Sequence, residues 1–130
     1  MDEPILARAT ETLRRAGARF AYVFGSRAEG TAGPRSDYDV AAWFGSRPAD
    51  GKLGGTLPFQ VDLLVLDHAP LELAGRVAMG GQLLFDDDPP ARVRWEATTR
   101  RIWLDERSRM DQARRDFVAG ARRRAAGTAG

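Results

Sequence analysis

The sequence has no cysteine, a single histidine and a single lysine among its 20 basic residues. Without cysteine, neither a disulfide framework nor a thiolate metal site can form. His68 has no second imidazole with which to share a metal, and we expect it in a turn. No apolar run approaches the roughly 20 residues that cross a bilayer, and the N-terminal stretch lacks the apolar segment of a secretory signal. We therefore expect a cytoplasmic protein that does not associate with membranes.

The chain has 130 residues, which fits one domain spanning residues 1–130. Apolar periodicity and glycine or proline punctuation predict three longer helices and four strands. The helices are expected at 2–16, 70–81 and 91–125, the last with a frayed tail, and the strands at 18–25, 38–44, 59–67 and 82–85. This order predicts an α+β domain with some α/β character. We expect a small mixed sheet of three or four strands flanked by helices, with helices on one face as the simplest packing, and a long C-terminal helix.

The net charge is +2, and much of the positive charge lies near the C-terminus. The stretch "RRDFVAGARRRAAG" holds five arginines and one aspartate. It indicates either a solvated helix end or contact with a phosphate-rich partner, although we do not expect direct nucleic-acid binding. The acidic run at 86–88 is interpreted as a solvated loop before Pro89.

Three aspartates lie in or beside predicted strands. Asp37 and Asp39 are two residues apart, so their side chains share one face of a strand, and Asp62 is an isolated charge within the apolar run "FQVDLLVL". If the two strands are adjacent, three carboxylates converge, which suits Mg²⁺ and even a pair of ions roughly 3.5–4 Å apart. The alternative is structural: Asp37 caps a turn, Asp39 faces solvent and Asp62 lies on an exposed strand face.

A Gly-Ser pair ends the strand that precedes these aspartates. Gly25 permits close approach to the backbone, Ser26 supplies a hydroxyl donor, and the following "SRAEG" is expected to be a helical turn. Backbone N–H groups at a helix start attract anions. Together with metals on the aspartates, this segment has the parts needed to hold a nucleoside triphosphate.

In these residues the sequence resembles the DNA polymerase β-type nucleotidyltransferase superfamily, whose signature is Gly-Ser, a spacer, Asp-x-Asp and a later Asp. The short chain, "GSRAEGTAGPRSDYDV", "VDLLVL" and "GQLLF" are similar to minimal nucleotidyltransferases, the MNT-type antitoxins of HEPN/MNT toxin–antitoxin pairs. The resemblance implies catalytic and metal-binding roles for Asp37, Asp39 and Asp62, and nucleotide binding by Gly25, Ser26 and Arg27. Glu29 stands where many relatives carry arginine, and Arg27 is a candidate to replace that phosphate contact.

The resemblance also implies a reaction. ATP with two Mg²⁺ ions would donate AMP to a tyrosine of a partner HEPN toxin and silence it. A small-molecule nucleotidyltransferase of the aminoglycoside-modifying kind, or an antitoxin that neutralises by binding alone, remains an alternative.

A stripe of large apolar residues follows the C-terminal helix at seven-residue intervals. Trp103, Met110 and Phe117 form this stripe, and they either pack into the core or form an interface for self-association or toxin binding.

Overall fold

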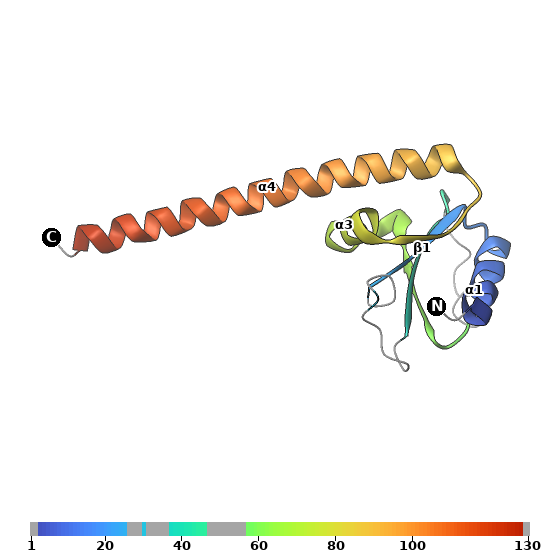
Figure 1. Cartoon of the computed structure of the whole chain (residues 1–130). Helices are drawn as coiled ribbons and strands as arrows, with labels where there is room; N and C mark the ends of the chain where they lie inside the picture. Colours follow the sequence, from blue (N-terminus) through green and yellow to red (C-terminus); the bar gives the residue numbers. More distant parts are fainter. Residues whose placement is uncertain (1–2, 26–29, 31–36, 47–56, 129–130) are drawn as a thin grey trace.

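The computed structural model describes residues 3–25, 30, 37–46 and 57–128. Its helices are α1 (Glu3–Arg15), α3 (Leu71–Gly80) and α4 (Pro89–Thr128), with a short 3-10 helix at Leu66–His68 that contains His68. The strands are β1 (Phe20–Phe24), β2 (Tyr38–Trp43), β3 (Val61–Val65) and β4 (Gln82–Asp86). Figure 1 shows an α+β fold from which α4 extends as a long helix.

The four strands form one mixed sheet in the order β3-β2-β1-β4. β1 pairs antiparallel with both β2 and β4, whereas β2 and β3 run parallel. A parallel pair needs a long crossover connection, and residues 44–60 supply it between β2 and β3. The strands that carry Asp39 and Asp62 are therefore direct neighbours, as the three-carboxylate hypothesis required.

Helices flank the sheet as expected, but they cover both faces, so the simplest packing with helices on one face is wrong. On one face, Leu6, Ala9 and Leu13 of α1 pack against the sheet. On the other, Val77 of α3 and Ala91 of α4 join a second cluster. The reason lies in the central strand: four consecutive residues of β1 are buried, so both of its faces are apolar and both need cover.

The acidic run at 86–88 ties three elements together, which corrects its interpretation as a solvated loop. The Asp88 carboxylate accepts the backbone N–H of Ala91 at 3.2 Å and caps α4, whose first residue is Pro89. Asp87 accepts two hydrogen bonds from the Arg14 guanidinium, each 2.8 Å long, and this pairing lowers the pKa of the Asp87 carboxyl. The cap explains why α4 begins two residues before the predicted helix.

The helix α4 has two parts with different surroundings. Its first half lies along α3, where Trp103 packs against Gly75, a position at which a side chain would collide with the indole ring. Its second half projects away from the other elements (Figure 1). There Met110 and Phe117 are 56% and 71% exposed. The stripe is thus partly buried at Trp103 and exposed beyond it. No helix among the described residues is long and apolar enough to span a membrane.

Candidate functional site

The three aspartates gather where β2 and β3 begin. Asp39 and Asp62 are directly paired in the parallel register, and Asp37 immediately precedes β2. Asp39 shares its strand face with Ala41, which belongs to the cluster beneath α3. Asp37 and Asp62 are exposed and Asp39 is partly buried. The fold thus places acidic groups from neighbouring strands on the face that α3 covers.

The electrostatics of Asp39 reflect this crowding. Burial raises the pKa of its carboxyl, and the negative charges of Asp62 and then Asp37 raise it further. The positive charge of Arg76, on α3, acts in the opposite direction. Like charges that raise one another's pKa attract a cation, because a bound cation removes their repulsion.

Gly25 allows the Asp39 carboxylate to occupy its position. Gly25 follows β1, whose last residue, Phe24, pairs with Asp39. Its φ of +71° lies in the left-handed region that glycine adopts readily. A Cβ atom at Gly25 would lie 2.5 Å from Oδ2 of Asp39. The sequence predicted that Gly25 permits close approach, and the group seen to approach is the carboxylate of Asp39.

The other predicted nucleotide-binding residues, Ser26 and Arg27, lie outside the described residues, as do most of the expected helical turn and Glu29. Arg76 was not among the sequence candidates. Its position after the third strand carries no motif, and only the packing of α3 over the sheet brings its charge near Asp39.

The carboxylates have the right chemistry for a hard divalent cation, since Mg²⁺ prefers oxygen ligands and commonly uses one or two carboxylates. Within the part of the chain that the structure describes, no three acidic or histidine side chains are close enough to form a complete metal site. Asp39 and Asp62, as register partners, form the acidic pair around which such a site would be completed by water and substrate oxygens.

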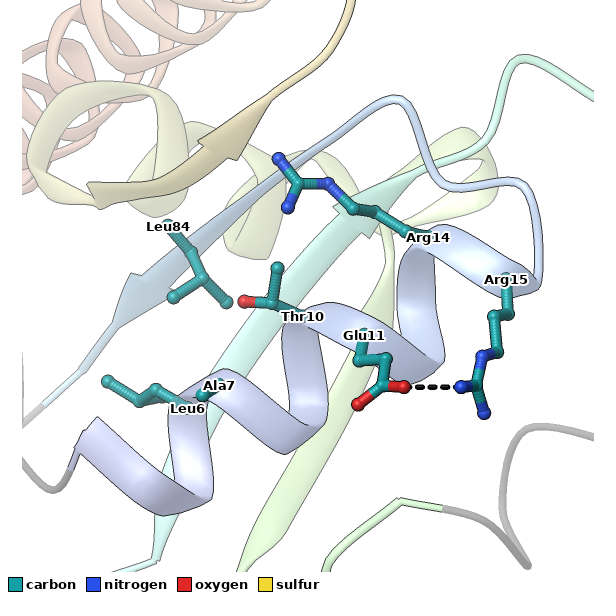
Figure 2. Close-up of a pocket in the computed structure, with 7 residues that line it drawn as sticks. All are labelled: Leu6, Ala7, Thr10, Glu11, Arg14, Arg15 and Leu84. Atoms are coloured by element: carbon teal, nitrogen blue, oxygen red, sulfur yellow. Dashed lines mark hydrogen bonds and ion pairs between the residues drawn. The ribbon is translucent and has the colours of Figure 1, made fainter.

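A shallow hollow lies elsewhere, between α1 and β4 (Figure 2). Leu6, Ala7 and Leu84 supply its apolar lining, and Arg14 lies at its margin. The Arg14 guanidinium is already paired with Asp87. This hollow belongs to the opposite sheet face from Asp39 and brings no acidic cluster together, so it is not the candidate site.

Comparisons with known proteins agree with this arrangement. Residues 9–90 match the family described as polymerase beta, nucleotidyltransferase. The search of curated proteins finds no match.

Two solved structures are similar over nearly the whole chain. A chain of a toxin–antitoxin crystal structure with AMP-PNP is 21% identical, with a TM-score of 0.68, covering 91% of this chain and 99% of its own. A second similar chain comes from a tri-AMPylated Shewanella oneidensis HEPN toxin in complex with an MNT antitoxin. It is 19% identical, with a TM-score of 0.67, and covers 91% of this chain and 99% of its own. At these identities the likeness concerns the fold.

Proposed function

Because the chain belongs to the polymerase β family of nucleotidyltransferases, we propose that it transfers AMP from ATP to a tyrosine hydroxyl of a HEPN-type toxin and thereby acts as its antitoxin. One observation carries the proposal: Asp39 and Asp62 are register partners on adjacent strands, with the Asp39 carboxylate packed against Gly25. The fold likeness to structures containing AMP-PNP or a tri-AMPylated toxin supports the choice of donor and acceptor.

The reaction assigns a role to each carboxylate. Asp37, Asp39 and Asp62 would hold two Mg²⁺ ions, which when bound would neutralise phosphate charge and align the reacting oxygens. The acceptor hydroxyl oxygen attacks the α-phosphorus, and the bond from that phosphorus to the bridging oxygen breaks. Pyrophosphate leaves with the bonding electrons. Asp62 accepts the hydroxyl proton, so atoms and charge balance.

The nucleotide is proposed to lie against the Gly25-Ser26 turn. Gly25 gives access to the backbone, the Ser26 hydroxyl donates to a phosphate oxygen, and Arg27 pairs with phosphate charge. Since the reaction consumes ATP and acts on a partner in the same compartment, we place the protein in the cytoplasm.

Binding of ATP with Mg²⁺ should stabilise the fold. At a ligand concentration one hundred times the dissociation constant, the gain is about 2.7 kcal/mol, which corresponds to a rise in Tm of roughly 10 °C for a domain of this size. The measurement is a melting curve with ATP and Mg²⁺, with ATP plus a chelator as the control. No shift at millimolar ATP, in a protein shown to be folded, would contradict a nucleotide site.

The projecting half of α4 is proposed to dock the partner toxin. Met110 and Phe117 are exposed there, and Arg114, Arg115 and Arg122 surround Val118. An apolar strip bordered by cations fits a partner surface that is apolar with an acidic rim.

Replacing both Met110 and Phe117 by Ala should weaken toxin binding roughly tenfold or more, because exposed large side chains at an interface carry much of the affinity. The Tm should change little, since exposed substitutions usually cost less than about 0.5 kcal/mol. Isothermal titration calorimetry measures the affinity. Val93→Ala, an apolar position on the packed half of α4 with an exposure close to that of Met110, is the matched control. Loss of the fold in the double variant, or unchanged affinity, would rule out this docking surface.

Sedimentation of the chain alone tests self-association through the same strip.

A further inference from the structure

Arg76 is an exposed cation on the helix that covers the carboxylate face. Its neighbour Val77 is buried in one cluster with Ala41 of β2, and Asp39 lies two residues before Ala41 on the same strand face. The helix α3 therefore covers the sheet face on which Asp39 lies, and the exposed Arg76 is near enough for its positive charge to act on the Asp39 carboxyl. No hydrogen bond or ion pair joins Arg76 to another residue in the described ranges, in contrast to Arg14, Arg92 and Arg100.

We propose that Arg76 binds the terminal phosphates of the nucleoside triphosphate and, after transfer, the pyrophosphate that leaves. This inference rests on the proposed function and assigns a residue that binds the β- and γ-phosphates. Arginine suits the task because its planar guanidinium donates two parallel hydrogen bonds to phosphate oxygens.

The position of α3 makes this role specific to Arg76. The residue before it, Gly75, faces the Trp103 ring of α4, and a residue one step along a helix is turned by roughly 100°. Arg76 is thus turned out of the contact between α3 and α4, and its side chain is exposed. Burial and the negative charges of Asp62 and Asp37 raise the pKa of the Asp39 carboxyl. The positive charge of Arg76 acts on the same carboxyl and lowers its pKa. A phosphate chain bound by the aspartates through metal ions would extend into the reach of this guanidinium.

Binding of ATP and of inorganic pyrophosphate, each with Mg²⁺, tests the proposal in wild type and Arg76→Ala. We expect both dissociation constants to rise roughly tenfold or more in the variant, since a charge-assisted hydrogen bond is lost from each ligand. Arg76→Lys should recover part of the loss, because lysine keeps the charge without the paired donors. Arg101→Ala, another exposed arginine on the neighbouring helix α4, is the matched control and should bind as wild type does.

Titration with Mg²⁺ alone separates phosphate binding from a local charge effect. Removing a positive charge beside the aspartates should leave Mg²⁺ affinity unchanged or slightly higher. If Arg76→Ala loses affinity for Mg²⁺ alone as strongly as for ATP, the residue acts on the carboxylates and the proposal is wrong. If wild type binds ATP and Arg76→Ala binds it equally well, the inference fails while the proposed function stands. If wild type binds no ATP, the proposed function itself fails, and this inference with it.

Discussion

Replacing Asp39 by Asn is expected to reduce AMP transfer to the partner by at least a hundredfold while preserving the fold. The amide has nearly the shape of the carboxylate but carries no charge. In the proposed reaction this charge holds the cations that neutralise the triphosphate, and removal of one preorganised charge-stabilising group commonly costs roughly 10²–10³ in rate. Intact-mass spectrometry of the partner after incubation with ATP and Mg²⁺ counts the added AMP groups.

The same substitution should stabilise the protein in the absence of ligands. Burial and the charges of Asp62 and Asp37 raise the pKa of Asp39 in the folded state. Between the unfolded and folded pKa values, the folded chain binds more protons than the unfolded chain, so stability falls as pH rises through that window. At neutral pH the charge on Asp39 therefore opposes folding, and Asn removes it. A higher Tm for Asp39→Asn at pH 7, with the difference shrinking as the pH approaches 4, is the expected result.

A control and a cellular assay separate catalysis from masking. Asp111→Asn removes one exposed carboxylate from α4 and should leave both transfer and Tm as in wild type. If Asp39→Asn protects cells from the toxin as well as wild type does, neutralisation occurs by binding, and the transferase role is wrong. A lower Tm in Asp39→Asn would instead show that the carboxylate makes a structural contact.

The residue pattern predicted the strands and identified the aspartates that lie on them. Apolar runs bounded by glycine and proline located all four strands within a few residues, and the isolated charge of Asp62 in an apolar run indicated a site. The pairing of Asp39 with Asp62 was a hypothesis conditional on strand order, because periodicity places a side chain on a face but does not say which strands are neighbours.

The sequence pattern does not predict features that depend on how the helices pack. A hydrophobic pattern of period 3.6 identifies the apolar face of α3. It does not show which part of the sheet the helix covers, so it does not indicate that Arg76 acts on Asp39. The seven-residue spacing of Trp103, Met110 and Phe117 likewise predicted one stripe. Helix α3 lies antiparallel to α4 and begins at Leu71, so its finite length determines that Trp103 is partly covered and Phe117 is exposed. The second apolar face of β1 is visible in the sequence as five consecutive apolar residues, Phe20–Phe24, a pattern that indicates cover on both sides of the strand.

Gly25→Ala should cost little stability but abolish most AMP transfer. The substitution strains the backbone at residue 25 and, separately, displaces the Asp39 carboxylate. An alanine at a φ of +71° pays about 1–2 kcal/mol for the left-handed conformation. Its Cβ would also meet Oδ2 of Asp39 at 2.5 Å. That atom is the end of a side chain that can rotate, so the collision is relieved by moving the carboxylate rather than the backbone.

Gly17 provides the matched control for this variant. Its φ is +96°, also in the left-handed region, and a Cβ there meets no atom within 4 Å. Gly17→Ala and Gly25→Ala should therefore lose similar stability in urea unfolding, while only Gly25→Ala loses AMP transfer, by a factor close to that of Asp39→Asn. Equal activity in the two glycine variants would mean that the exact placement of the Asp39 carboxylate does not matter for the reaction. A stability loss at Gly25 several kcal/mol larger than at Gly17 would mean that the carboxylate cannot rotate away, and that Gly25 serves the fold before it serves the site.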